Sequence, residues 1–325
     1  MPDVEICSVR GWEVVRLGTD AIVVEVVPGL GGTITSVRRR RDDLELLWQS
    51  PWGLRPPYDR SVGDTRGRRW SADPGGWKSI FPNAGDATSI HGTEWAEDGE
   101  AWVAPFDHEL DEDGSLIMTT RLVRAPFELR KVVSVRGDTL SVVESIRNVG
   151  GVALETVWGS QLLFGSPLLA ASATLDCAAN LVHPDPEVVS DASYSDITPW
   201  PRSQGPAGMI NLHTLLGPEA QDRRLVYLDE LDAGRLSVEN RGLELRVELD
   251  WDLDAWPYVV YELESAGSSG FPFFDSGYFL RIQPSSSWPT KGLYDARRIS
   301  SSTVWFDPGQ QRSSHLDLRV HDLAP

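Results

Sequence analysis

The chain has 325 residues, with 30 lysines and arginines against 48 aspartates and glutamates, so its formal net charge at pH 7 is −18. Hydrophobic residues make up 41% and charged residues 24%, a composition typical of folded globular chains that excludes wholesale disorder. The acidic balance argues against a nucleic-acid partner, because a phosphate backbone attracts clustered lysine and arginine.

No segment carries the roughly 18 consecutive apolar residues that a membrane helix requires, and charged residues interrupt the first thirty positions, where a secretory signal would lie. We therefore predict a soluble, cytoplasmic protein with no membrane partner. The two cysteines, Cys7 and Cys177, do not fit a disulfide framework or a metal-ligand pair. The six histidines include no H-x-H or H-x-x-x-H pair, so neither a metal site nor a cofactor is predicted.

Short runs with a period of two, rich in Val, Ile, Leu and Thr, recur along the chain, and this alternation is typical of half-buried β-strands. The runs are 21–27, 115–123, 127–135, 139–147, 234–239, 242–249, 278–283 and 314–320. Turn residues such as Asp113-Gly114 and Gly137-Asp138 separate them, and Asn240-Arg241-Gly242 is a predicted hairpin connection. No window carries an apolar stripe at helical spacing. We therefore predict an all-β fold, a large antiparallel β-sandwich with little helix.

Two long stretches, 49–95 and 180–222, interrupt this pattern and are rich in proline. Long loops on a rigid β scaffold commonly carry binding residues. No shift in composition marks a boundary, so we predict one domain over residues 1–325. The run Arg38–Arg41, followed by Asp42 and Asp43, is predicted to be a solvated hairpin tip, with a polyanion site as the alternative.

Several familiar motifs are absent from the sequence: the phosphate-binding loop, the dinucleotide-binding glycine motif and the nucleophile elbow. Three segments, 75–95, 157–165 and 278–287, instead combine aromatic, amide and charged residues. Each segment alone fits a strand end with a satisfied polar side chain. The chain also has 13 tryptophans, and an indole can lie flat against a sugar ring, although core packing is the better explanation for any single one.

Taken together and in this order, these segments resemble the aldose 1-epimerase, or galactose mutarotase-like, superfamily. The opening run 27–37, which contains Gly31-Gly32, and the following run 44–48 are similar to the family's first β-hairpin. The resemblance covers about residues 21–320. It implies a galactose mutarotase-like supersandwich with a sugar-binding cleft on one sheet.

Three further segments support the same resemblance. Phe81-Pro82-Asn83 with His91-Gly92 is similar to the family's substrate loop. Residues 256–262 resemble a strand that lines the cleft, and residues 307–310 resemble the turn before the final strand.

Two positions depart from the family pattern. In the family, a glutamate in an E-P turn is the base and a histidine in a W-G-x-H motif is the acid, and together they move the protons that open and close the sugar ring. Here the first position reads Gln283-Pro284 and the second reads Trp158-Gly159-Ser160-Gln161. A carboxamide forms hydrogen bonds but does not exchange a proton near neutral pH. The alignment therefore implies a pocket that can hold sugar hydroxyls while the usual acid–base pair is absent.

The resemblance also supplies the other candidate site residues. His91 and Glu262 are the candidate catalytic residues, and Glu262 has the alternative role of a solvated residue or a structural partner for an arginine. The candidate substrate-binding residues are Asn83, Trp77, Trp158, Gln161 and Gln283.

We predict an aldose 1-epimerase-like protein, an isomerase by resemblance, that acts on or binds a sugar or cyclic hemiacetal with non-standard or lost mutarotase chemistry. Two alternatives stay open: a non-catalytic sugar sensor, and a recruited enzyme for a larger cyclic substrate such as a natural product. An apolar rim would suit that larger substrate; it would consist of Trp77, Trp95, Trp158, Trp256 and Trp288. A group of arginines could attract an anionic sugar, or form surface salt bridges; they are Arg55, Arg60, Arg66, Arg68 and Arg69.

Overall fold

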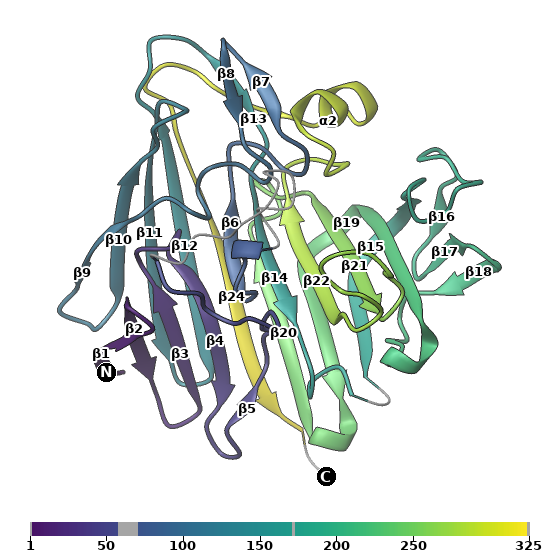
Figure 1. Ribbon diagram of the computed structural model, residues 1–325, viewed down its shortest axis with the longest axis horizontal. Helices are drawn as coiled ribbons and strands as arrows, with labels where there is room; N and C mark the ends of the chain where they lie inside the picture. The colour runs from purple at the N-terminus through teal and green to yellow at the C-terminus, as the bar shows by residue number, and fades with distance from the viewer. Residues whose placement is uncertain (1, 58–70, 171–172, 324–325) are drawn as a thin grey trace.

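The computed structural model describes residues 2–57, 71–170 and 173–323, with 53% strand and 5% helix. Its main strands form one continuous antiparallel sheet that folds into two layers (Figure 1). The prediction of an all-β antiparallel sandwich with little helix is confirmed. No helix within the described ranges is long and apolar enough to span a membrane.

The first layer contains eight strands in a row and one short hairpin partner. In spatial order these are β1 (Asp3–Val9), β2 (Trp12–Gly18), β3 (Ile22–Val27), β4 (Thr33–Arg39), β6 (Trp77–Ile80), β14 (Gly159–Phe164), β22 (Tyr278–Ser285) and β21 (Tyr258–Ser265), with β5 (Leu44–Glu45) beside β4. β6 and β14 come from chain segments about 80 residues apart, so this layer is assembled from distant parts of the sequence.

The second layer and the two strands that join the layers complete the sheet. In spatial order the second layer consists of β9 (Asp107–Leu110), β10 (Leu116–Arg121), β11 (Phe127–Arg136), β12 (Thr139–Asn148), β24 (Gln311–Asp322) and β20 (Leu245–Trp251). The joining strands are β15 (Thr174–Pro184) and β19 (Asp222–Asn240). β19 pairs with β21 through residues 222–228 and with β20 through residues 235–240, so the sheet passes from one layer to the other along this strand.

Short elements lie around the ends of the sandwich. They are β7 (Thr88–Ile90), β8 (Thr93–Trp95), β13 (Leu154–Thr156), β23 (Val304–Phe306), β16 (Thr198–Pro199), β17 (Arg202–Gly205), β18 (Gly208–Asn211), the helix α2 (Leu293–Ile299), and the 3₁₀ turns η2 (Pro218–Ala220) and η3 (Arg241–Leu243). The hairpin β7–β8 and α2 lie together at the top of Figure 1. The stretches 49–95 and 180–222, which interrupt the alternating pattern, therefore also contribute short strands.

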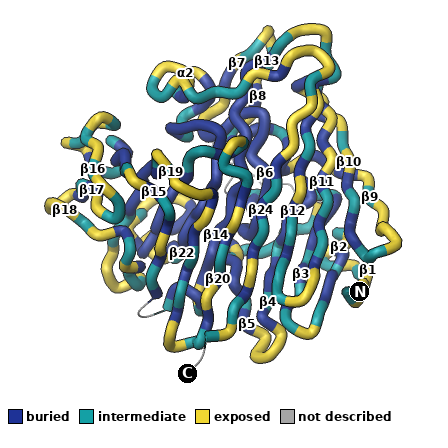
Figure 2. The backbone as a smooth tube through the Cα atoms, turned by 180° about the vertical axis from the view of Figure 1, so that it is seen from behind, coloured by how far each residue is buried: buried dark blue, intermediate teal, exposed yellow. Residues whose placement is uncertain are grey.

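The main core lies between the layers, where alternating residues of facing strands meet. β11 and β12 show the expected alternation of buried and exposed positions. In β6 and β14, by contrast, every residue is buried, as the dark blue of these strands in Figure 2 shows. Burial on both faces means that the first layer is also covered on its outer side. Trp288 packs there on Tyr227 and Val260, and Phe273 packs on Phe279.

The turn between β3 and β4 requires glycine. Gly31 and Gly32 both have positive φ angles, 64° and 57°. A Cβ atom at Gly31 would lie 2.2 Å from the carbonyl oxygen of Trp102, which is far inside contact distance. The glycine pair therefore lets the 95–106 segment pack directly against this turn.

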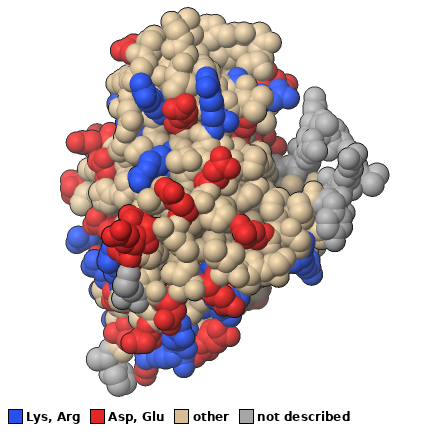
Figure 3. Space-filling model, turned by 90° about the vertical axis from the view of Figure 1, so that its left-hand side faces the viewer, with Lys and Arg blue, Asp and Glu red and all other residues tan. Residues whose placement is uncertain are grey.

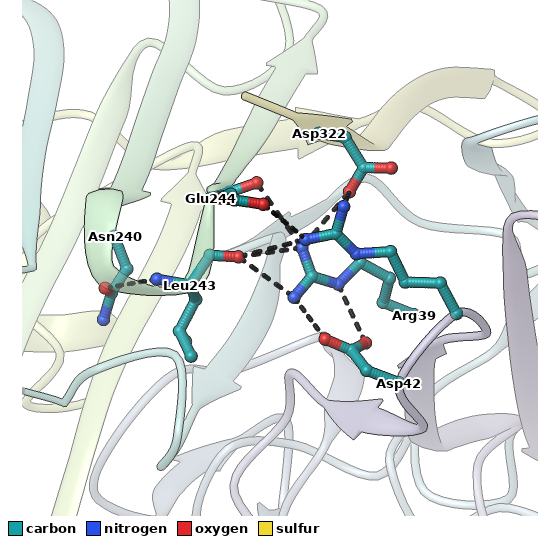
Figure 4. A network of polar contacts seen from close by, with 7 residues as sticks. Arg39, Asp42, Asn240, Leu243, Glu244 and Asp322 are labelled. Atoms are coloured by element: carbon teal, nitrogen blue, oxygen red, sulfur yellow. Dashed lines mark hydrogen bonds and ion pairs between the residues drawn. The ribbon is translucent and has the colours of Figure 1, made fainter. Parts of the chain in front are cut away.

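The arginine run at the end of β4 is only partly the solvated tip that the sequence predicts. The side chain of Arg39 is 3% exposed and donates to both carboxylate oxygens of Asp42, at 3.0 and 2.6 Å. It also donates to the carbonyl oxygen of Leu243 at 3.1 Å and forms an ion pair with Asp322 at 3.2 Å (Figure 4). Arg39 thus ties the β4–β5 hairpin to η3 and to the last strand, because a planar guanidinium can serve several acceptors at once.

Figure 3 turns the left-hand side of Figure 1, where β9 and β10 lie, toward the viewer. Acidic and basic side chains are interspersed over this side of the molecule. Cys7 and Cys177 are both free thiols, and burial raises the pKa of Cys177 to about 12. In the part of the chain that the structure describes, no group of three His, Cys, Asp or Glu side chains could hold a metal ion.

Candidate functional site

Alternate residues of the central strands of the first layer point away from the core onto its outer face. Gln161 of β14 pairs with Lys78 of β6. The register of β14 against β22, in which Gly159 pairs with Ser285 and Leu162 with Ile282, places Gln161 opposite Gln283. Gln283 pairs in turn with Val260 of β21. Directly paired residues share one face of a sheet, so Lys78, Gln161, Gln283 and Val260 form one line across it, which we call the glutamine row.

The two glutamines bury polar atoms that have no partner. Both side chains are 1% exposed, and neither Oε1 of Gln161 nor Nε2 of Gln283 has a hydrogen-bond partner. Gly159 leaves room for this arrangement, since a Cβ atom there would lie 3.4 Å from Nε2 of Gln283 and 2.9 Å from the carbonyl oxygen of Pro284. An unsatisfied buried polar group costs about 1–3 kcal/mol. The pair therefore holds one acceptor and one donor that the protein itself does not use.

Lys78 is the charged member of the glutamine row, and the sequence analysis assigned it no role. Its buried ammonium forms an ion pair with the buried carboxylate of Asp73 and lies 5.3 Å from the centre of the Trp102 ring. Asp73 also accepts a hydrogen bond from the backbone N–H of Gly75 at 2.8 Å. The available signal is strand alternation: Trp77 and Lys78 are neighbours in β6, so an indole in the core sends the lysine to the outer face.

Glu262 lies on the same face, beside Arg281 in the adjacent strand β22. Its Oε1 accepts hydrogen bonds from Nε and Nη2 of Arg223 at 3.0 and 2.8 Å, and its Oε2 lies 3.0 Å from Nη2 of Arg281. Nε of Arg281 is buried without a partner. Both oxygens of Glu262 thus face guanidinium groups, which is the structural alternative that the sequence left open for this residue.

The line of paired residues continues beyond the glutamine row toward the layer junction. Val260 pairs with Tyr227 of β19, which pairs with His183 of β15. The indole of Trp288 covers this end, stacked on Tyr227 with ring centres 5.5 Å apart and 4.3 Å from the imidazole of His183. The indole nitrogen of Trp288 is buried without a partner. Unused polar atoms therefore extend along this face.

His183 is the histidine that lies on this face. Its Nε2 is 3.2 Å from Oδ2 of Asp229, and its Nδ1 is 2.9 Å from the carbonyl oxygen of Tyr194. Burial lowers the pKa of His183, but the hydrogen bonds to Asp229 and Tyr194 outweigh burial, and its pKa is raised above the ordinary value. Both ring nitrogens are occupied, so this histidine is held by the protein.

Asn83 organises the segment in which the family resemblance placed a substrate contact. Its Nδ2 donates to the carbonyl oxygens of Asp86 at 2.8 Å and Ala96 at 3.1 Å. Its Oδ1 accepts a hydrogen bond from the backbone N–H of Leu293, the first residue of α2, at 3.0 Å. The whole amide is therefore used to join the 83–96 segment to α2.

His91 lies at the exposed tip of the β7–β8 hairpin. His91 and Gly92 have φ angles of 47° and 83°, as a two-residue turn of mirror-image type requires. No hydrogen bond or ion pair connects the His91 side chain with Gln161, Gln283 or Glu262 in the described structure. His91 lies on the β7–β8 hairpin and Glu262 on β21, so the two candidate catalytic residues belong to different elements.

Trp77 and Trp158 point to the other face of the same strands, into the core. The Trp77 indole nitrogen donates to Oγ of Ser160 at 2.7 Å, and that of Trp158 donates to Oε1 of Glu144 at 2.6 Å. Trp158 also packs edge-on against Trp256, with ring centres 5.3 Å apart. Gln161 and Gln283 therefore come together on the outer face, whereas these two tryptophans lie on the core face.

The structure describes all five tryptophans of the predicted rim but only one of the five arginines of the predicted group. The Trp95 indole donates to the carbonyl oxygen of Arg124, and its side chain is buried like those of the other tryptophans of the predicted rim. Arg55 donates to the carbonyl oxygen of Ser71 at 3.3 Å. Arg60, Arg66, Arg68 and Arg69 lie outside the described residues.

No family model matches the chain, and no curated protein matches it. Several solved structures do match it. A galactose mutarotase-like protein from Clostridium acetobutylicum has a TM-score of 0.68 and 11% identity, and the match covers 99% of each chain. The fold is that of the galactose mutarotase-like proteins.

Two further structures show the same likeness. A galactose mutarotase-like protein from Lactobacillus casei has a TM-score of 0.66 at 16% identity, covering 95% of this chain and 100% of that one. A candidate aldose 1-epimerase from Escherichia coli K12 has a TM-score of 0.65 at 17% identity, covering 99% and 100%. At these identities the likeness concerns the fold, and the function has to be argued from the side chains of this chain.

Proposed function

We propose that this protein binds a sugar or a related cyclic polyol on the outer face of the first layer, with Gln161 and Gln283 as its central hydrogen-bonding pair. The observation that supports this proposal is the unused acceptor of Gln161 opposite the unused donor of Gln283. A hydroxyl group both donates and accepts, so one sugar hydroxyl satisfies both atoms. Buried polar atoms without partners are rare in native proteins, and a ligand supplies the missing partners.

The same geometry supports binding without the proton transfers of an aldose 1-epimerase. Neither carboxamide exchanges a proton near neutral pH, Glu262 is engaged by Arg223 and Arg281, and His91 lies at a hairpin tip. Of the alternatives that the sequence left open, this favours a sugar sensor or binding protein. The larger cyclic substrate receives less support, because all five tryptophans of its predicted rim are buried.

Binding is tested by titration calorimetry of the intact chain with glucose, galactose and their methyl glycosides. We expect saturable binding by at least one of these sugars. The variants Gln161→Leu and Gln283→Leu, which keep side-chain volume but remove the amide, should each weaken binding at least tenfold. Gln311→Leu, the same change at the exposed start of β24, is the matched control and should bind like the parent. Equal affinity in all four proteins contradicts the proposal.

Catalysis is tested by polarimetry of freshly dissolved anomers. We expect the parent protein to leave the rate at the buffer value, and the double variant Gln161→His with Gln283→Glu to raise it by restoring an acid and a base. A parent protein that accelerates anomer exchange, and loses this activity in Gln283→Leu, would show that the amide pair takes part in a catalytic mechanism.

A further inference from the structure

A polar cavity lies on the outer face of the first layer, over β3, β4 and β5. Its volume is about 630 Å³. Its lining comes from five chain segments and comprises Glu25, Ser36, Arg38, Asp43, Glu45, Leu47, Trp48, Gln49, Gly165, Ser166, Ser276 and Tyr278. We call it the Trp48 groove. Gly165 lies four residues beyond Gln161 along the chain, about 13 Å in an extended strand, so the groove is separate from the glutamine row.

One wall of the Trp48 groove is aromatic and fixed in place. The Trp48 ring contacts Phe279 with centres 5.2 Å apart and an interplanar angle of 51°, and Phe273 at 6.4 Å and 71°. Both phenylalanines thus approach at an angle, and the half-buried indole still lines the groove. The Tyr278 hydroxyl donates to the carbonyl oxygen of Leu169, which holds the second ring of the lining. A rigid indole of this kind presents a surface to the C–H face of a sugar ring.

The polar residues of the lining are equally fixed. Oε2 of Glu45 accepts from Oγ of Ser36 at 2.5 Å, and Oε1 accepts from the backbone N–H groups of Val37 and Leu47 at 3.0 and 2.9 Å. Burial raises the pKa of Glu45, although these hydrogen bonds oppose the shift. A carboxylate held by three donors cannot swing away, and its remaining lone pairs are positioned acceptors for a ligand hydroxyl.

Arg38 contributes a donor to the lining. It forms ion pairs with Glu25 at 3.5 Å and Asp43 at 3.1 Å, while its Nε is buried without a partner. The lining therefore contains three carboxylates and one guanidinium. This excess of negative charge disfavours sugar phosphates and uronates and leaves uncharged polyols as the matching class.

We propose that the Trp48 groove binds an uncharged saccharide, with the ring stacked on Trp48 and its hydroxyls held by Glu45 and Arg38. The inference shares the ligand class of the proposed function but none of its residues. The groove is a second saccharide site on the same face as the glutamine row.

The test follows the indole N–H signals of the ¹⁵N-labelled chain during titration with methyl glucoside, maltose and glucuronate. We expect the Trp48 signal, assigned by its loss in Trp48→Phe, to shift saturably with the two neutral sugars and not with glucuronate. Trp48→Ala removes this reporting signal, so its sugar binding is followed by titration calorimetry, in which the affinity at the groove should fall at least tenfold. Trp305→Ala, at a half-exposed indole in β23, is the matched control and should not change it.

Two further variants keep the test decisive. If Trp48→Ala does not fold, Gln49→Trp places a bulky ring at an exposed position of the lining and should block the groove without disturbing the core. The double variant Gln161→Leu with Gln283→Leu should leave the Trp48 response intact, which separates this site from the glutamine row. No Trp48 shift with either neutral sugar, a shift that survives Gln49→Trp, or an equal response to glucuronate would overturn the proposal.

Discussion

Polar side chains are buried on both faces of β6 and β14, and the two faces differ in how many of these polar groups have hydrogen-bond partners. On the core face, Glu144 accepts from the Trp158 indole at 2.6 Å and from Oγ of Ser79, and it lies 3.8 Å from the ammonium of Lys131. Lys131 in turn donates to the carbonyl oxygen of Gly31 at 3.1 Å. Each of these charged groups has partners of opposite character.

On the outer face of the first layer, by contrast, polar atoms remain unused. Oε1 of Gln161, Nε2 of Gln283 and Nε of Arg281 are buried and have no partner. A fully paired network can stabilise and define a core, whereas an unpaired group lowers stability. The charged network around Glu144 therefore serves the fold, although Nε1 of Trp256 and Oγ of Ser314 are also buried on the core side without a partner. On the outer face the unused capacity belongs to amide and guanidinium groups, which suits a ligand with several hydroxyls.

The largest effect is expected from breaking the core network. Glu144→Ala leaves the Lys131 ammonium buried without a counter-ion and removes the acceptor of Trp158, so the free energy of unfolding should fall by about 3–5 kcal/mol. Urea unfolding followed by tryptophan fluorescence measures it. Glu128→Ala, at an exposed position of the adjacent strand β11, should cost little. Equal stability of the two variants would mean that the core network contributes no more than a surface residue.

Arg39, a buried arginine at the end of β4, extends the comparison to a paired group outside the core. Arg39→Lys keeps the charge but cannot serve Asp42, Leu243 and Asp322 together, so we expect a loss of roughly 1.5–3 kcal/mol. Arg41→Lys, at a partly exposed position of the same turn, is the matched control. If the Arg39→Lys variant unfolds at the same urea concentration as the parent protein, the planar, forked geometry of the guanidinium is dispensable for stability.

The outer face should respond in the opposite direction. Gln161→Leu combined with Gln283→Leu removes two unsatisfied polar atoms, so the free energy of unfolding without ligand should rise by about 1–3 kcal/mol while sugar binding is lost. Differential scanning calorimetry with and without sugar measures both effects. A double variant that is less stable than the parent would indicate that the two amides have a structural role.

The strands were predictable wherever one face of the strand is buried and the other is exposed to solvent. The runs 127–135 and 139–147 agree with β11 and β12 to within one or two residues, because alternation records that asymmetry. β6 and β14 are buried on both faces and carry no such signal. The first half of β19 escaped prediction for the same reason, since the run 224–228 is buried without alternation.

The site was predictable only in part. The resemblance singled out Gln161 and Gln283, but their positions opposite one another follow from the register of two strands about 120 residues apart. The role of Asn83 depends on a backbone N–H 210 positions away. Trp77 and Lys78 illustrate a third reason. As neighbours in a strand they must point to opposite faces of the sheet, but the sequence does not tell which face is the core.

The smallest expected effect concerns His183 and Asp229, at the end of the outer face. The folded pKa of His183 is raised above 6.5, so its contribution to stability is complete below that value and is lost as the pH rises through the folded pKa. The pKa of Asp229 is lowered below 3.8: burial alone would raise it, but the hydrogen bond from His183 outweighs burial. The ion pair of His183 and Asp229 therefore stabilises the fold most between pH 3.8 and pH 6.5, the ordinary pKa values of the two groups.

Asp229→Asn should remove this pH dependence. The stability difference between parent and variant is expected to be largest near pH 5–6 and to shrink toward pH 9, because a neutral imidazole gains little from a carboxylate. Asp176→Asn, at an exposed position of β15, is the control and should change stability little, and equally, at both pH values. Glu230 also raises the pKa of His183, so a residual slope in Asp229→Asn should disappear in Asp229→Asn with Glu230→Gln. A difference that stays constant from pH 5 to pH 9 would show that Asp229 acts on His183 as a hydrogen-bond acceptor rather than through charge.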